Sequence, residues 1–157
     1  MAERTDLVDA LVTASRVLVS VAVRSIDAAE PEVTVTQHRI LVVLAARGPQ
    51  RIGDLALELN VNSSNATRHC DRLQRAGLVD RQRSAQDGRA VCVSLTAAGR
   101  DLLDQVTKTR RAEIAAILDA MPAEHHDDLV IALRAFGEAA GELSDSEWVV
   151  NAREAPA

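Results

Sequence analysis

Residues 52–75 constrain the fold most strongly, because they divide into two short helical runs with three residues between them. The first run ends at Leu59, and Asn60 follows where the chain needs a left-handed residue, a conformation that Asn tolerates better than most residues. Asn62 is placed to cap the second run, which Gly77 ends. We therefore expect two helices joined by a tight turn, which is a helix-turn-helix.

The spacing of apolar residues changes from helical to alternating after Leu78. Residues 78–83 and 90–95 have the pattern of strands, and Asp87-Gly88 between them is a strong signal for a hairpin turn. Three apolar residues of the second strand share one face of the predicted ribbon: Val91, Val93 and Leu95. A two-stranded wing is therefore expected directly after the helix-turn-helix.

Two helices are predicted before this unit. Residues 5–28 carry an apolar residue at every third or fourth position, which is typical of an amphipathic helix. Thr34 and Gln37 form a capping-box pattern that begins a second helix, and Gly48-Pro49 ends it.

Two more helices are predicted after the wing. Thr96 caps a long helix, and Pro122 separates it from a last helix whose heptad-like apolar spacing ends at Leu143. Residues 144–157 look like a tail, with Trp148 as an anchor. The predicted fold class is mainly α (α+β), a winged helix-turn-helix with flanking N- and C-terminal helices.

The flanking helices carry more apolar surface than the small central unit can cover. Only 1% of the residues are aromatic, so the core must be built from aliphatic side chains. Aliphatic stripes left exposed favour association, and pairing of the same helices from two copies is the economical way to bury them. We expect a homodimer.

The charge of the chain is unevenly distributed. The net charge is −5, yet residues 51–100 hold eight Lys/Arg against five Asp/Glu, while the C-terminal third is strongly acidic. Binding to nucleic acid depends on the local charge more than on the total. The basic middle third is therefore the expected contact surface, and the acidic ends should face away from it.

One face of the second helix in the helix-turn-helix is cationic. At 100° per residue, the buried side holds Ala66, Cys70 and Leu73. The opposite side carries Ser64, Arg68, Arg72 and Arg75, with Asn65 at its edge. Arginine can read guanine or grip phosphate, and Ser and Asn can bond to base edges or backbone. A solvated helix face would also explain these charges.

The predicted wing is basic as well. Arg81, Arg83 and Arg89 place three positive charges on a short ribbon with Asp87-Gly88 at its tip. Such a wing can follow phosphates and insert an arginine into a narrow minor groove. A hairpin that serves only solubility would carry the same charges, but its position after a basic helix-turn-helix favours DNA.

The run TVTQHRILVVLAARG, followed by IGDLALELNVNSSNATRHCDRLQRAGLVDRQRSAQDGRAVCVSLTAAGR, resembles the MarR (multiple antibiotic resistance regulator) family of bacterial transcription factors. Its most specific parts are TR-x-x-DRL-x-x-x-GLV-x-R, DGR and LT-x-x-G. Three positions depart from the family pattern: Asn60 replaces a Gly in the turn, Ser63 replaces a Pro, and His38 replaces an aromatic residue.

The resemblance implies a dimer whose first and last helices interlock. It places Ser64, Asn65, Thr67, Arg68 and Arg72 on or near the recognition surface. It makes Arg89 the wing arginine, oriented by an ion pair with Asp87. With the residues derived above, the full set of expected DNA contacts is Ser63, Ser64, Asn65, Thr67, Arg68, Arg72, Arg75, Arg81, Arg83, Asp87 and Arg89.

The expected division of the chain follows. We predict an N-terminal dimerisation helix (1–33), a winged helix-turn-helix DNA-binding domain (34–98), C-terminal dimerisation helices (99–143) and a tail (144–157). The recognition helix is expected at about 62–76 and the wing at about 79–95.

We expect the protein to be a sequence-specific repressor that binds a palindromic operator in double-stranded DNA. The resemblance further implies release by a small phenolic or anionic effector, for which Arg16 and His38 are the candidate residues. The alternatives are a winged-helix module for protein contact and a nucleoid-type binder without sequence preference.

Other classes of function find little support in the sequence. His125, His126, Asp127 and Asp128 are metal-ligand types, but adjacent helical residues point in different directions, so we predict no metal site and no cofactor. Cys70 and Cys92 are expected to be ordinary thiols. No nucleophile has a base in motif form, so no enzyme is predicted. Without a membrane span or a secretory signal pattern, the chain is expected to be cytoplasmic.

Overall fold

The computed structural model describes residues 3–84 and 87–148 of the 157-residue chain. Its helices are α1 (Arg4–Asp27), α2 (Val35–Arg47), α3 (Ile52–Glu58), α4 (Ser63–Arg75), α5 (Ala97–Asp119) and α6 (His126–Ala139), with the 3-10 turns η1 (Ala123–His125) and η2 (Asp145–Glu147). The strands β1 (Gln50–Arg51), β2 (Val79–Arg83) and β3 (Val91–Leu95) form an antiparallel sheet in the order β1-β3-β2. The predicted fold class, a mainly α winged helix-turn-helix, is confirmed.

The helix ends are where the capping residues place them. The Thr34 hydroxyl accepts a hydrogen bond from the Gln37 backbone N–H at 3.2 Å, and the Gln37 side chain accepts one from the Thr34 N–H at 2.8 Å. The Asn62 side-chain oxygen caps α4 by accepting a hydrogen bond from the Asn65 backbone N–H at 2.8 Å. Asn60, in the turn before it, has a φ of 52°, the left-handed conformation that was expected.

The sheet differs from the prediction in two respects. Strand β1 was not predicted, because two residues are too few to show an alternating pattern; its Gln50 lies opposite Val93. The apolar face of β3 was predicted to include Val91, but Val91 is half exposed while Val93 is fully buried. Val91 lies opposite Arg83 at the turn end of the hairpin. The two residues of β3 that pair with β1 come after it, so β1 does not cover Val91.

The core is aliphatic, as predicted, and joins α2, α3, α4, β2 and β3 to the start of α5. Its largest fully buried side chains include Ile40, Leu41, Leu44, Leu55, Leu73, Leu78, Val93, Leu102 and Leu103. Trp148 packs against this core, so its predicted role as an anchor is confirmed. The predicted tail is not featureless, since η2 lies within it; residues 149–157 fall outside the described part.

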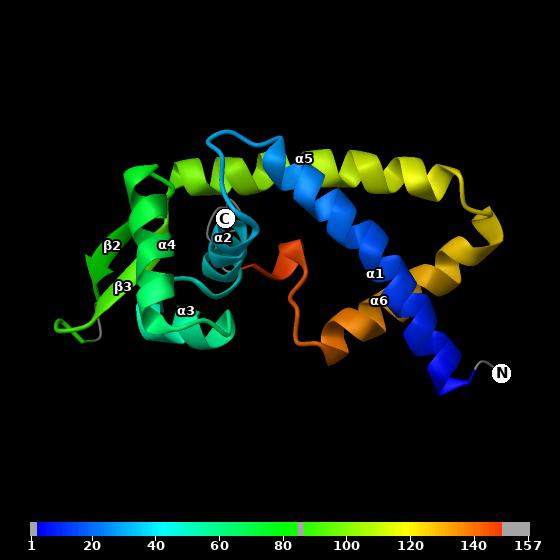
Figure 1. The fold of residues 1–157 in the computed structure, drawn as a ribbon, viewed down its shortest axis with the longest axis horizontal. Coiled ribbons are helices and arrows are strands. Elements are labelled where there is room, and N and C mark those ends of the chain that lie inside the picture. The colour runs from blue at the N-terminus through cyan, green and yellow to red at the C-terminus, as the bar shows by residue number, and fades with distance from the viewer. Residues whose placement is uncertain (1–2, 85–86, 149–157) are drawn as a thin grey trace, which may run out of the picture.

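Helices α1 and α6 lie on the side of the molecule away from the wing, and α5 runs along the molecule from the sheet towards them (Figure 1). Only the end of α1 is buried, at Val21, Ser25 and Ile26, and α6 buries no residue. Large apolar side chains on both helices are therefore exposed, among them Leu7, Leu18, Val19, Ile131, Leu133 and Phe136.

Candidate nucleic-acid interface

Helix α4 presents a polar, cationic face to solvent because its other face is anchored in the core. The buried face consists of Ala66, Cys70 and Leu73, each of which is at most 1% exposed. The opposite face exposes Ser64, Arg68, Arg72 and Arg75. Both faces match the prediction from helical spacing. Burial also raises the pKa of the Cys70 thiol, which keeps it protonated and unreactive at neutral pH.

Local hydrogen bonds arrange the start of this face. The Ser64 hydroxyl donates to the Asn62 side-chain oxygen at 2.8 Å, next to the bond that caps the helix. The Arg68 guanidinium donates to the side-chain oxygen of Asn65, three residues earlier. Arg68 is therefore held along the helix surface rather than extended freely, and its orientation depends on Asn65.

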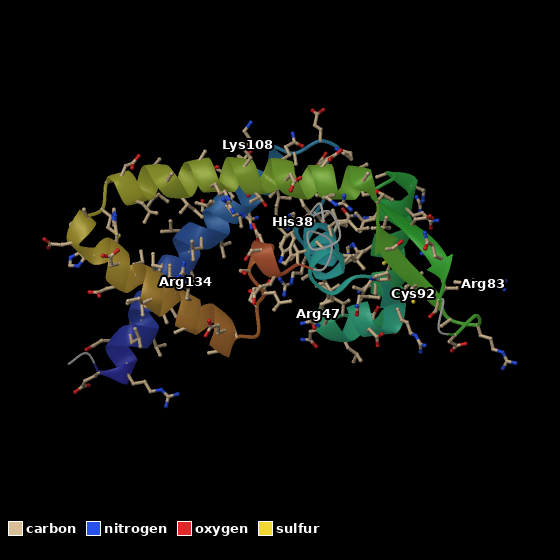
Figure 2. The ribbon with its side chains drawn as sticks, turned by 180° about the vertical axis from the view of Figure 1, so that it is seen from behind. His38, Arg47, Arg83, Cys92, Lys108 and Arg134 are labelled. Atoms are coloured by element: carbon tan, nitrogen blue, oxygen red, sulfur yellow. The ribbon has the colours of Figure 1, made fainter. Side chains whose placement is uncertain are left out.

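The three predicted wing arginines have different surroundings. Arg83 is exposed on β2, at the end of the molecule opposite Arg134 of α6 (Figure 2), and Arg89 is exposed just before β3. Arg81 is instead directed at α4, where its guanidinium forms a part-buried ion pair with Asp71. Arg81 thus connects the wing to the helix, and Arg83 and Arg89 remain available to a partner.

The predicted ion pair between Asp87 and Arg89 is not formed in the described part of the chain. The Asp87 carboxylate accepts a hydrogen bond from the Arg89 backbone N–H at 3.1 Å, so it stabilises the turn and does not orient the Arg89 guanidinium. Its other oxygen lies 3.7 Å from the guanidinium of Arg51. This contact could not be predicted from the sequence, because Arg51 belongs to the unpredicted strand β1.

The structure also contains a cavity of about 520 Å³ between α1, α2, α5 and the C-terminal segment 141–148. His38 lies in its wall and is 7% exposed. Burial, and then the nearby charges of Arg110 and Arg39, lower the pKa of His38 to about 4, so this side chain is neutral at pH 7. Positive charge in the wall comes from arginines instead.

The two candidate effector residues are not brought together. Arg16 is exposed on α1 and does not line this cavity, whereas Arg110 does, and its Nε donates to the Ser25 hydroxyl at 3.2 Å. Burial lowers the pKa of Arg110, an effect that Asp145 opposes. Arg110 was missed because its position in the long helix α5 carries no motif.

The other candidate sites gain nothing from the structure. Within the described ranges, no group of three or more His, Cys, Asp or Glu side chains is arranged to hold a metal ion. Cys92 is half-buried and Cys70 is buried, and both are free thiols. In the same part of the chain, no helix is long and apolar enough to cross a membrane.

Residues 33–91, which hold α2, the helix-turn-helix and most of the wing, match the MarR family. Over 124 residues the chain is 30% identical to YkoM of Bacillus subtilis (strain 168), an uncharacterized HTH-type transcriptional regulator, covering 78% of this chain and 80% of that relative. Among solved structures, RV1404 from Mycobacterium tuberculosis is 41% identical, with a TM-score of 0.82, covering 92% of this chain and 99% of that one.

A more distant structure, Streptococcus pneumoniae FabT in complex with DNA, is 19% identical with a TM-score of 0.67 over 88% of this chain and 98% of that one, and so shows the fold alone. The family match and the similarity to YkoM fall on the same exposed helix and basic hairpin that the geometry singles out. This chain belongs to the MarR family of HTH-type, DNA-binding transcriptional regulators.

Proposed function

We propose that the protein is a homodimeric repressor that binds a palindromic operator through α4. The observation that carries this proposal is the division of α4 into a buried apolar face and an exposed face of arginine, hydroxyl and amide groups. The proposed contacts on this helix are Ser63, Ser64, Asn65, Thr67, Arg68, Arg72 and Arg75. Arginines can read guanine or hold phosphate, and the shorter side chains can bond to bases or backbone.

The wing contributes the second half of the proposed contact. Arg83 and Arg89 are exposed beside α4 and suit the phosphates and the adjacent minor groove. Asp87 would act by shaping the turn before Arg89 and by holding Arg51 near the base of the wing. We assign Arg81 to bracing the wing against α4, since Asp71 occupies its guanidinium.

The dimer is proposed from the exposed apolar helices. Residues 1–33 and 99–143 form the dimerisation unit and residues 34–98 the DNA-binding unit. Pairing of α1 and α6 between two copies would cover side chains such as Leu18 and Phe136, each more than half exposed in the single chain. Two α4 helices about 34–36 Å apart would then meet successive major grooves on one side of the duplex. A dimer bound to the promoter in this way would repress transcription by occupying the DNA.

The effector is proposed to be a small phenolic or other aromatic anion bound in the 520 Å³ cavity. His38 supplies a neutral hydrogen-bonding wall, and Arg110 supplies charge in place of the predicted Arg16. A panel of aromatic carboxylates should raise the melting temperature of the protein, and Arg110→Gln should remove the shift. Arg16→Gln is the matched control, because Arg16 lies outside the cavity wall.

A mobility-shift titration on the DNA upstream of its own gene tests the proposed DNA contact. Arg68→Ala should change the ranking of operator variants, because base contacts carry sequence information. Arg89→Ala should weaken binding to all sequences and lower the salt dependence by up to about one ion per site. Lys108→Ala, an exposed cation on α5 outside the proposed contact between α1 and α6, is the control and should change neither.

Each other outcome identifies a different function. No shift at micromolar protein would favour a module for protein contact. A shift that unrelated competitor DNA removes as well as operator DNA does would favour binding without sequence preference. A uniform loss on Arg68→Ala would mark that residue as a phosphate contact.

A further inference from the structure

The segment 141–148 returns from the end of α6 to the winged helix-turn-helix. Gly141 has a φ of 72°, which lets the chain leave α6 sharply, and the Glu142 N–H closes the helix end by donating to the Gly137 carbonyl. Beyond it, Ser144 and Glu147 form a capping box that gives η2 a defined shape. The segment therefore has its own local structure.

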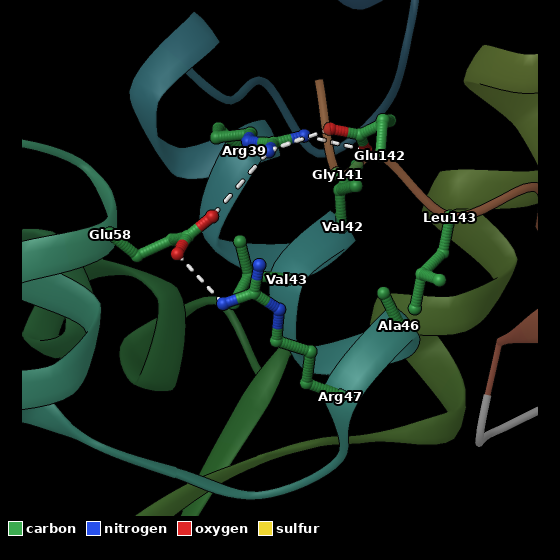
Figure 3. Close-up of a pocket in the computed structure, with 9 residues that line it drawn as sticks. All are labelled: Arg39, Val42, Val43, Ala46, Arg47, Glu58, Gly141, Glu142 and Leu143. Carbon is green, nitrogen blue, oxygen red and sulfur yellow. Dashed lines mark hydrogen bonds and ion pairs between the residues drawn. The ribbon is translucent and has the colours of Figure 1, made fainter. Parts of the chain in front are cut away.

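Charged groups fasten this segment to α2 and α5. Arg39 of α2 binds Glu142 through two parallel hydrogen bonds, each 2.9 Å long (Figure 3). Asp145 lies 3.6 Å from the guanidinium of Arg111 on α5. Leu143 and Trp148 line the 520 Å³ cavity between these two contacts. The segment thus forms one wall of the cavity and joins two of the three helices that form the others, α2 and α5.

Arg39 also faces the helix-turn-helix. The same guanidinium lies 3.8 Å from Glu58 at the end of α3, and Glu58 in turn is 2.7 Å from Arg47 (Figure 3). Glu142 holds both guanidinium nitrogens at short range, while Glu58 has only the longer contact. The C-terminal segment and α3 therefore share one arginine, and α3 packs directly against α4.

We infer that segment 141–148 is a releasable latch, held by the Arg39–Glu142 pair, which covers one side of the cavity and couples the state of the cavity to α3. The pair can open because both side chains are about half exposed, where ion pairs are weak and screened by salt. On opening, Trp148 and Leu143 leave the cavity wall, and the Arg39 guanidinium moves to Glu58. A change at the cavity is thereby passed to the helix that supports α4.

The latch carries its own reporter, because Trp148 is the only tryptophan of the chain and there is no tyrosine. Glu142→Gln removes one charge of the closing pair, so Trp148 should become more accessible. We expect its emission to shift to longer wavelength and its acrylamide quenching constant to rise about two-fold. Arg39→Gln should have the same effect, and the double variant should show no more than either single one, since both remove one contact.

Glu138→Gln is the matched control, because it removes the same charge from α6 one turn before Glu142. Equal emission and quenching in Glu142→Gln and Glu138→Gln would overturn the latch. Glu58→Gln tests the sharing of Arg39 from the other side, since it removes the competitor and should lower the quenching constant below that of the wild type. A rise in that variant would overturn the proposed connection to α3.

These measurements need neither DNA nor effector, so they are independent of the proposed function. If the latch opens as expected but the protein does not bind its upstream DNA, the proposed repressor function is contradicted and the latch is supported. If the protein binds DNA but Trp148 is equally quenched in every variant, the latch is contradicted and the proposed repressor function is supported.

Discussion

His38 combines a titratable side chain with a site that disfavours its charged form. Burial and two neighbouring arginines lower its pKa to about 4. In the unfolded chain the same imidazole takes up a proton near pH 6.5. Between pH 6.5 and pH 4 the unfolded state therefore binds more protons than the folded one, so acidification through this range destabilises the fold. The full shift corresponds to up to about 3 kcal/mol.

His38→Gln should remove this part of the pH dependence. Urea unfolding at fixed protein concentration should show the wild type losing stability from pH 6.5 to pH 4, and the variant losing less over the same range. His125→Gln serves as a matched control, because it removes an exposed imidazole instead of a buried one. An unaltered slope in His38→Gln would assign the acid sensitivity to other groups.

Two glycines at the junction of wing and α5 have different reasons to be glycine. A Cβ at Gly99 would lie 2.2 Å from the Leu78 carbonyl oxygen and 2.7 Å from Leu95. Thr96, which caps α5, also bonds to the Gly77 carbonyl at 2.7 Å, so this close approach fixes the start of α5 on the end of α4. Gly77 itself has open space around it but a φ of 74°.

Gly99→Ala should therefore cost more than Gly77→Ala. We expect a loss of about 1–3 kcal/mol at Gly99, where backbone must move, and about 1 kcal/mol at Gly77, where only the left-handed conformation is strained. Denaturant unfolding of both variants measures the difference. Equal losses would mean that α5 shifts to accommodate the methyl group at no cost.

At the scale of elements, the ion pair between Asp71 and Arg81 connects α4 with β2. If it braces the wing, Asp71→Ala should weaken DNA binding, although it removes a negative charge beside the DNA surface. The variant should also lose about 1 kcal/mol of stability, and the double variant with Arg81→Ala should lose less than the sum of the singles. Tighter binding by Asp71→Ala would instead identify Arg81 as a phosphate contact.

Elements with local signals could be predicted from the sequence. The capping side chains of Thr34, Asn62 and Thr96 bond to backbone within three residues, so a short window of sequence contains the whole interaction. The two faces of α4 follow from helical spacing alone, which is why its buried residues and exposed arginines were both predicted.

Features that depend on distant partners could not be predicted in this way. Strand β1 exists only because it pairs with β3, more than forty residues later. The partners of Asp87 and Arg81 are likewise set by how the wing folds back, and the Arg39–Glu142 contact spans 103 positions. No periodicity or cap marks such contacts, so the sequence could predict Asp87 and Arg81 as DNA contacts but not their ion pairs with Arg51 and Asp71.

At the scale of the whole molecule, the exposed stripes of α1 and α6 predict that the single chain is not the stable form. Phe136→Asp and Leu18→Asp place a charge on side chains that are 56% and 52% exposed in the single chain. Either change should shift sedimentation towards the monomer and weaken operator binding with it, because the two α4 helices lose their fixed spacing. Leu57→Asp is the control for added charge, since Leu57 is 82% exposed on α3.

A wild-type protein that sediments as a monomer at micromolar concentration would contradict the dimer. Dissociation of the Leu57→Asp variant as well would show that the paired surface reaches α3.

The helix α5 is continuous over 23 residues, with its start built into the winged helix-turn-helix and its end beside α6. At 1.5 Å per residue it is a rod of roughly 34 Å. Such a rod acts as a lever arm: a tilt of about 5° at its far end would carry the attached winged unit through roughly 3 Å, most of the rise of one base pair. In the proposed dimer, small changes in the contact between the two subunits would thereby be amplified into a change of register along the duplex.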